Sequence, residues 1–396
     1  MMAVAAAASV KVAIVAGETS GDILGGALIS ALRERVEAVE VCGVAGPVMR
    51  QAGCESLADA HELAVMGFID PLKQLPRLLR LRSMLIERIS LWRPDVFVGI
   101  DAPAFNLGLA GRFRSRGIAT VQYVSPQVWA WRQGRVRKIA QRCDLVLCLL
   151  PFEPAFYRSH AVRAEFVGHP LADQIPLEPD RSGARAALNI GPGPCLALLP
   201  GSRISEVRLL ARPFVDAAIE LTRRRPGLQL LAPMANAQVR AEFNRVLAAM
   251  PQSGALALQV LDGRARVCLT ASDAALVASG TAALEALLCR CPMIVAYKVG
   301  PFTALLLRTL RLVRLKHVSL PNLLSGEQVA PEFLQEAVTS ANLSAAAESA
   351  LDDAPRRAQL QEKFLEVHRS LRAGGAGRAA EAIIQLLRER KLVRAS

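Results

Sequence analysis

The sequence predicts an α/β protein made of two Rossmann-like domains whose parallel sheets face a central cleft. Short β-branched or apolar runs alternate with longer helical patterns, as in βαβ units that wind a parallel sheet. A second series of such runs begins after a segment rich in proline and glycine. The chain has 396 residues and 52% hydrophobic side chains, which is enough for two or three domains with large cores.

The expected strands fall into two series. The first lies at residues 10–16, 39–44, 95–100, 119–124, 144–149 and 164–168, and the second at 195–200, 228–233, 256–261, 274–279 and 292–297. We therefore expect an N-terminal domain over 1–172, a linker over 173–194 and a C-terminal domain over 195–372. The segment 378–396 has Ala, Ile and Leu on one helical face, which predicts a terminal helix that can pack on either domain, including back on the N-terminal one.

The charge balance indicates anionic partners. Lys and Arg number 48 against 35 Asp and Glu, and the net charge of +13 suits nucleic acid, phosphorylated metabolites or an acidic lipid surface. The eight cysteines form no CxxC pair and no dense framework, which is typical of a reduced, intracellular protein. No HExxH or strand-linked DxD pattern indicates a metal, and no cofactor is expected. Neither a signal peptide nor a membrane span is expected from the apolar patterns.

Two loops of the first domain carry candidate functional residues, because ligands of open parallel sheets bind beyond the carboxyl ends of strands. The loop GETSGD (17–22) permits a tight turn, but Glu18 and Asp22 would repel a pyrophosphate, so a hydroxyl-rich ligand suits it better than NAD. Helix capping by Ser20 or Asp22 is the alternative. Asp101 ends an apolar strand, where a carboxylate can act as a general base. The alternative is that Asp101 caps a helix starting near Ala104.

The second domain has two turns that can bind an anion. In LLPGSR the amides of Gly201 and Ser202, the helix dipole and Arg203 form a phosphate site, unless the turn merely exposes its arginine. Ser279, Gly280 and Thr281 open a second helix, and Glu285 lies four residues after Thr281 on the same face. That spacing suits a diphosphate at the helix end and a ribose at the carboxylate, although an ordinary capped helix has a similar pattern.

Three other features leave alternatives open. Asn322 either fixes its own turn or contacts a ligand, and His169 either faces the cleft or is a buried, satisfied imidazole. The segment YVSPQVWAWRQGRVRKI (123–139) joins aromatic and basic residues, but core packing of Trp129 and Trp131 is favoured over nucleic-acid binding.

Two leucine-rich segments, 75–91 and 302–317, have arginines at three-residue spacing, as in interfacial membrane helices. The arginines expected to contact the membrane are Arg77, Arg80, Arg308, Arg311 and Arg314. Amphipathic core helices are the alternative.

Taken in order, these loops resemble those of the lipid-A-disaccharide synthase family. The resemblance rests on GETSGD (17–22), LAVMGF (63–68), GIDAP (99–103) with Phe105 and Asn106, YVSPQVWAWRQGRV (123–136), PFE (151–153), VGHPLAD (167–173), LLPGSR (198–203), SGTAALE (279–285) and VSLPNLL (318–324). The chain departs from the family at Ala104, where an acidic residue is usual, and at Thr19, where Ala or Pro is usual. Ala104 leaves Asp101 as the stronger candidate for an essential carboxylate.

The resemblance implies an inverting, metal-independent GT-B glycosyltransferase. Its donor would be UDP-2,3-diacylglucosamine, its acceptor 2,3-diacylglucosamine 1-phosphate (lipid X), and its products the β(1→6) disaccharide 1-phosphate and UDP. Asp101 would be the catalytic base. The family pattern places Ser202, Arg203, Ser279, Gly280, Thr281, Glu285 and Asn322 on the UDP-sugar and Glu18, Ser20 and Asp22 on the acceptor side.

The expected location is the cytoplasmic face of the inner membrane, without nucleic acid as a partner. The sequence leaves the oligomeric state open. Two other functions stay open: another UDP-sugar enzyme of this fold, either an epimerase or a transferase to a different acceptor, and a noncatalytic lipid- or nucleotide-binding protein.

Overall fold

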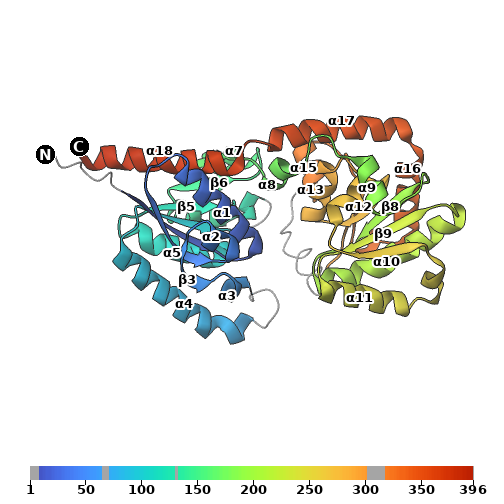
Figure 1. Ribbon diagram of the computed structural model, residues 1–396, viewed down its shortest axis with the longest axis horizontal. Coiled ribbons are helices and arrows are strands. Elements are labelled where there is room, and N and C mark those ends of the chain that lie inside the picture. Colours follow the sequence, from blue (N-terminus) through green and yellow to red (C-terminus); the bar gives the residue numbers. More distant parts are fainter. Residues whose placement is uncertain (1–8, 65–70, 130–132, 301–316, 396) are drawn as a thin grey trace. The chain divides into compact units, whose positions relative to one another are not determined.

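The computed structural model describes residues 9–64, 71–129, 133–300 and 317–395 (Figure 1). The chain divides into two compact units, the first formed by Met1–Asp173 with Leu371–Ser396 and the second by Gln174–Ser370. Each unit is an α/β domain built on one parallel sheet. The predicted fold class, two α/β domains with parallel sheets, is confirmed.

The first unit contains a seven-stranded sheet with the order β3-β2-β1-β4-β5-β6-β7. Its strands are β1 (Val10–Ala16), β2 (Val39–Ala45), β3 (Glu55–Asp59), β4 (Val96–Ile100), β5 (Ala119–Tyr123), β6 (Leu145–Cys148) and β7 (Ala164–Phe166). Strand β1 pairs with both β2 and β4, so the winding direction reverses between β1 and β4. Ligands of open parallel sheets bind at such a switch point.

Helices cover both faces of this sheet because successive strand residues point to opposite sides. They are α1 (Thr19–Arg33), α2 (Pro47–Gln51), α3 (His61–Ala64), α4 (Pro71–Trp92), α5 (Pro103–Arg114), α6 (Val136–Ala140), α7 (Glu153–Arg158), α8 (Pro170–Gln174) and α18 (Gly375–Ala395). Ile14 packs with Leu28 of α1 and Ile383 of α18 on one face, and Val15 packs with Leu85 of α4 on the other. Figure 1 shows α18 lying beside α1.

The second unit contains a six-stranded sheet with the order β10-β9-β8-β11-β12-β13. Its strands are β8 (Cys195–Leu199), β9 (Gln229–Met234), β10 (Leu258–Asp262), β11 (Ala274–Ala278), β12 (Met293–Tyr297) and β13 (Glu332–Leu334). Its helices are α9 (Arg181–Ala187), α10 (Ile204–Arg224), α11 (Ala237–Ala248), α12 (Ala265–Ala271), α13 (Thr281–Leu288), α15 (Leu320–Ser325), α16 (Ser340–Asp352) and α17 (Ala354–Leu371). The winding direction reverses between β8 and β11, which pair in parallel.

The structure differs from the sequence-based expectation in two kinds of segment. Strands β3 and β13 were not predicted, because both are short edge strands of mixed polarity that lack an apolar run. The expected linker 173–194 carries α9, which Asp180 caps through the Gly183 amide at 2.9 Å. Leu188 and Ile190, which follow α9, pack with Leu231 of β9, so this segment belongs to the second unit.

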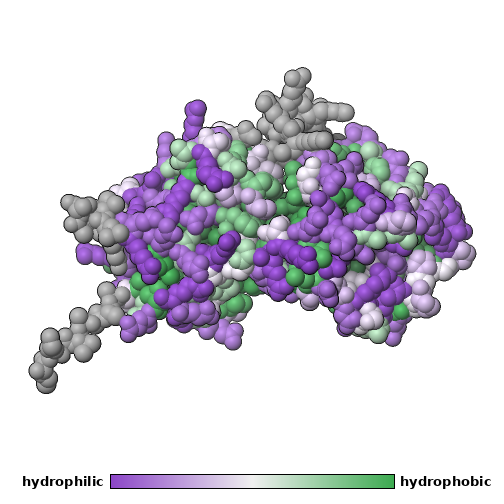
Figure 2. All heavy atoms as spheres, turned by 90° about the horizontal axis from the view of Figure 1, so that it is seen from above, coloured by the Kyte–Doolittle hydropathy of each residue, from purple (hydrophilic) through white to green (hydrophobic). Residues whose placement is uncertain are grey.

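The surface of the described residues mixes polar and apolar side chains. On the face shown in Figure 2, hydrophilic side chains are widespread and hydrophobic ones lie between them. None of the helices among the described residues has the length and apolar character that a bilayer span requires. All eight cysteines are buried and free.

Candidate functional site

Asp101 follows β4 directly, at the switch point of the first sheet. Asp101 and Ala102 both have left-handed backbone, with φ of 51° and 40°. This region costs free energy for residues with a Cβ, although Asp tolerates it better than most. Strained residues persist only where their surroundings fix them, and they cluster at functional sites.

Two buried side-chain amides fix the backbone at Asp101. The Asn106 Nδ2 donates to the Asp101 carbonyl at 2.9 Å, and the Gln122 Nε2 donates to the same oxygen at 3.1 Å. The Asp101 amide donates to the Tyr123 carbonyl of β5 at 2.9 Å. No hydrogen bond within the described part of the chain engages the half-buried Asp101 carboxylate. The group is therefore held in place by its backbone while its carboxylate stays available.

The alternative role of Asp101 as a helix cap is wrong. Helix α5 begins at Pro103, and its N-cap position is Ala102, which makes no side-chain cap bond. The backbone turn at Asp101 and Ala102 therefore starts the helix without using the carboxylate.

The loop after β1 lies directly against the Asp101 turn. A Cβ on Gly17 would come within 2.6 Å of the Ala102 Cβ, so only glycine allows this approach. Glu18 is the N-cap position of α1 but makes no side-chain cap bond, and both Glu18 and Ser20 are exposed. These two side chains are therefore available beside Asp101.

Asp22 has a different role from the one its loop predicted. Its buried carboxylate accepts from the amides of Gly46 at 2.8 Å, Val48 at 2.9 Å and Met49 at 3.0 Å. These bonds tie α1 to the start of α2 and satisfy orphan amides of that helix. We therefore correct the acceptor-side assignment of Asp22 to a scaffold role and keep Glu18 and Ser20.

In the second unit, the predicted anion site after β8 holds a carboxylate of the chain itself. The amides of Ser202 and Arg203 donate to the Glu206 Oε2 at 3.0 and 3.3 Å. The Arg203 Nη1 pairs with the Glu206 Oε1 at 3.1 Å, although 73% of the Arg203 side chain stays exposed. Sequence reasoning missed Glu206, whose position at N3 of α10 is that of a capping box.

The turn after β11 is open. Gly280 has φ of 143°, and a Cβ there would meet nothing within 4 Å. Gly280 and Thr281 are exposed at the start of α13, where the structure shows no acceptor among the described residues for the Thr281 amide. The Ser279 amide donates to the Ala296 carbonyl at 2.9 Å. Because β8 and β11 are neighbours, the Arg203 and Gly280 turns lie at one edge of the sheet.

Glu285 lies one turn further along α13 and forms a partly buried ion pair. Its Oε1 accepts from the Arg266 Nε of α12 at 3.1 Å, and 19% of the Glu285 side chain is exposed. The Arg266 Nη2 also donates to the Gln174 Oε1 at 2.9 Å. A ribose at Glu285 would use the carboxylate oxygen that Arg266 leaves free.

Asn322 is fully buried and its side chain is saturated. Its Oδ1 accepts from the amides of Val329 and Ala330, both at 2.8 Å, and its Nδ2 donates to the Ala330 carbonyl and the Glu332 Oε1, both at 2.8 Å. The loop-fixing alternative is confirmed for Asn322, and we withdraw its donor contact. It anchors α15, which packs beside α13.

His169 is half-buried, and one nitrogen of its imidazole has a hydrogen-bond partner among the described residues. Its Nδ1 accepts from the Leu171 amide at 3.2 Å, and its own amide donates to the Leu371 carbonyl at 2.9 Å. Burial lowers the pKa of His169 to about 4, so the ring is neutral at pH 7. The described residues contain no group of three or more His, Cys, Asp or Glu arranged to hold a metal ion.

Helix α4 has one buried and one exposed apolar face. Leu81, Leu85 and Ile89 are buried, whereas 49% of Leu75 and 42% of Leu79 are exposed. Arg80 is exposed on the same part of the helix, and the exposed Arg77 pairs with Glu62 at 3.1 Å. Arg308, Arg311 and Arg314 lie outside the described residues.

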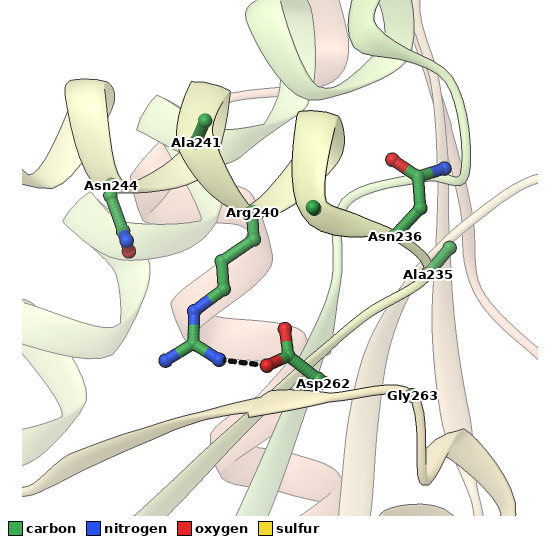
Figure 3. Close-up of a pocket in the computed structure, with 8 residues that line it drawn as sticks. Ala235, Asn236, Arg240, Ala241, Asn244, Asp262 and Gly263 are labelled. Atoms are coloured by element: carbon green, nitrogen blue, oxygen red, sulfur yellow. Dashed lines mark hydrogen bonds and ion pairs between the residues drawn. The ribbon is translucent and has the colours of Figure 1, made fainter.

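One further cavity lies at the carboxyl edge of the second sheet, at the ends of β9 and β10. It has a volume of about 460 Å³, and Arg240 of α11 faces Asp262 across it in an ion pair (Figure 3). Asn236 and Gly263 also line it. Sequence reasoning did not predict this cavity, because its lining comes from the start of α11 and the end of β10, which carry no motif.

Comparisons with known proteins agree on a family and a fold. The sequence profile of the family described as lipid-A-disaccharide synthetase matches residues 12–383. The chain is 50% identical over 376 residues to the lipid-A-disaccharide synthase of Yersinia pseudotuberculosis, covering 95% of this chain and 94% of that one. It is 48% identical over 376 residues to the enzyme of the same name from Escherichia coli O1:K1, covering 95% of this chain and 97% of that one.

Solved structures support the fold. The UDP-GlcNAc 2-epimerase of Neisseria meningitidis bound to UDP-GlcNAc is similar with a TM-score of 0.61 at 13% identity, covering 96% of this chain and 100% of that chain. A glycosyltransferase of Rickettsia africae is similar with a TM-score of 0.58 at 11% identity, covering 96% and 98%. At these identities the likeness is one of fold, and it agrees with the predicted GT-B class.

Proposed function

The chain belongs to the lipid-A-disaccharide synthetase family, and we propose on that premise which substrates it joins and which residues act. It is a glycosyltransferase of lipid A disaccharide synthesis. The proposed donor is UDP-2,3-diacylglucosamine and the proposed acceptor is 2,3-diacylglucosamine 1-phosphate. The products are the β(1→6) disaccharide 1-phosphate and UDP, formed with inversion at the anomeric carbon.

The single observation that carries the mechanism is the available carboxylate of Asp101 on a strained, doubly anchored turn. The acceptor 6-hydroxyl gives its proton to Asp101 as its oxygen attacks the donor anomeric carbon. The bond from that carbon to the UDP oxygen breaks, and UDP leaves with the electron pair. A base held this rigidly needs little reorganisation in the transition state. Glu18 and Ser20 hold the acceptor sugar.

The leaving diphosphate is assigned to the carboxyl edge of the second sheet. The exposed amides of Gly280 and Thr281 and the exposed guanidinium of Arg203 are donors aimed at developing negative charge. Ser202 and Ser279 add hydroxyl groups, and Glu285 takes the ribose. For a phosphate to enter the turn after β8, it has to displace the Glu206 carboxylate.

We propose that α4 brings the enzyme to its acylated substrates at the cytoplasmic face of the inner membrane. Exposed Leu75 and Leu79 lie on the same part of this helix as Arg77 and Arg80, so leucines can enter the acyl layer while cations face anionic head groups. Membrane contact by Arg308, Arg311 and Arg314 remains a prediction from the sequence.

The test of the function is a reconstituted reaction. Purified protein is incubated with UDP-2,3-diacylglucosamine and 2,3-diacylglucosamine 1-phosphate in the presence of EDTA. We expect equal amounts of disaccharide 1-phosphate and UDP. Release of UDP without the acceptor, epimerised donor, or no turnover in EDTA would contradict the proposed reaction.

A further inference from the structure

A buried carboxylate outside the proposed site connects to the strand end that carries Asp101. Glu153 opens α7, and only 3% of it is exposed. Its Oε1 accepts from the Trp129 Nε1 at 3.0 Å, and its Oε2 accepts from the Leu150 amide at 3.0 Å. Within the described residues no ion pair reaches this carboxylate. A buried carboxylate is costly to keep charged, and its two hydrogen bonds offset part of that cost.

Trp129, the side-chain partner of Glu153, belongs to the segment that follows β5. The Trp129 ring stacks edge-on against Phe152, with centroids 4.8 Å apart. The buried Ser125 hydroxyl contacts the Tyr157 Oη of α7 at 3.0 Å. Helix α7 therefore contacts both ends of the segment from Ser125 to Trp129, one end through Tyr157 and the other through Glu153.

This segment is coupled to Asp101 through direct contacts. Val124, which precedes Ser125, has φ of 71°, a costly conformation for a β-branched residue. The Gln122 Nε2 donates both to the Val124 carbonyl at 3.3 Å and to the Asp101 carbonyl at 3.1 Å. A shift of the Ser125 segment would therefore pull on the amide that anchors the Asp101 turn.

We propose that Glu153 is a positioning residue that holds Trp129, and with it the segment from Ser125 to Trp129, beside the Asp101 turn, and that it does so as the carboxylate and not as the carboxylic acid. The proposal rests on the proposed function of Asp101. The carboxylate accepts from Trp129 on one oxygen and from Leu150 on the other. The acid must instead donate its own proton, which displaces one of these donors.

The protonation equilibrium of Glu153 lies in the working pH range. Burial, the largest cause, raises its pKa to about 7, against the hydrogen bonds from Leu150 and Trp129. Among the residues that the structure describes, the titratable groups that face it are the Cys148 thiol of β6 and the Tyr157 phenol of α7. Burial raises the pKa of both, so both are neutral at pH 7. At pH 6, one unit below this pKa, about nine molecules in ten carry the acid.

The first experiment needs no substrate. Tryptophan emission is followed from pH 5 to pH 9 in the full-length protein and in Glu153→Gln, Trp129→Phe and Glu381→Gln variants. The wild type and the exposed-surface control Glu381→Gln should show a transition near pH 7, and the other two variants should lose it. A transition that persists in Glu153→Gln overturns the proposal, whatever reaction the enzyme catalyses.

The second experiment measures kcat and KM for transfer over the same pH range. We expect wild-type kcat to fall about tenfold from pH 8 to pH 6, as the carboxylate fraction falls. In Trp129→Phe the pKa of Glu153 rises further because a donor is lost, so the acid limb of kcat should move to higher pH. The Glu153→Gln variant should have a low kcat that does not change with pH around pH 7. An acid limb that stays unmoved in Trp129→Phe, with the variant folded by circular dichroism, contradicts the positioning role.

Discussion

The carboxyl edges of the two sheets share a topology but present opposite charges. At the switch point of the first sheet the chain places a carboxylate, Asp101, on left-handed backbone. At the switch point of the second it places glycine turns, with amides at Gly280 and the guanidinium of Arg203. The comparison teaches that the Rossmann-like frame fixes where a ligand binds, while the residues after each strand fix which charge it meets.

The two carboxyl edges also differ in whether their polar groups already have partners within the protein. The Asp101 carboxylate has no hydrogen-bond donor among the described residues, whereas the turn at Ser202 is filled by the carboxylate of Glu206. On the proposed mechanism, the first edge is preorganised for a proton transfer, and the second edge has to exchange an internal anion for the diphosphate.

The largest effect should come from replacing Asp101, the carboxylate at the carboxyl edge of the first sheet. Asp101→Asn keeps a residue that tolerates left-handed backbone, so the fold should hold. We expect turnover to fall about 100-fold or more, because the acceptor loses its general base, while UDP binding is retained. Turnover is measured by UDP release, and UDP affinity by calorimetry. Near wild-type turnover would remove Asp101 from the mechanism.

The next effect tests whether the position of that acid matters. Gly17→Ala places a Cβ 2.6 Å from the Ala102 Cβ and should push the Asp101 turn aside. We expect turnover to fall about tenfold or more, since a small misplacement of a catalytic group is costly. The matched control is Gly17→Ala with Ala102→Gly, which removes the clash and should recover most of the activity. If the double variant is as slow as the single one, displacement of Asp101 is not the cause.

A smaller effect should come from removing the Glu206 carboxylate from the turn after β8. Glu206→Gln removes the anion that competes with phosphate for the Ser202 and Arg203 amides. We expect UDP to bind about two- to fivefold more tightly, the scale of an exposed charge interaction. Arg203→Ala should weaken UDP binding and serves as the opposite control. Unchanged affinity in both variants would show that phosphate does not use this turn.

The smallest effect on binding should come from Asn322. Its side chain makes four hydrogen bonds inside the second unit, so Asn322→Ala leaves buried groups unsatisfied. We expect the free energy of unfolding to fall by about 2–4 kcal/mol, while the folded variant binds UDP within about twofold of the wild type. Urea unfolding and calorimetry on one sample separate the two. A large loss of UDP affinity with unchanged stability would instead support a direct contact between Asn322 and the ligand.

Sequence patterns predicted most of the frame and the glycine turns because these depend on local signals. The apolar runs gave the central strands, and the glycine after β8 and β11 marked the turns. The edge strand β3 was missed because ESLAD has no apolar run. The roles of Asp22, Glu206 and Glu153 were missed because their partners are mainly backbone amides or a distant indole. Which amide meets a carboxylate is decided by tertiary packing.

The central claim is that the second unit binds the nucleotide through helix-end amides while the first unit supplies the base. A crystal structure of the chain with UDP tests it most directly. The account predicts phosphate oxygens within hydrogen-bond distance of the Gly280 and Thr281 amides, the Glu206 carboxylate displaced from the Ser202 amide, and the Asp101 carboxylate free of UDP. UDP bound on the first unit, or phosphates distant from α13, would contradict it.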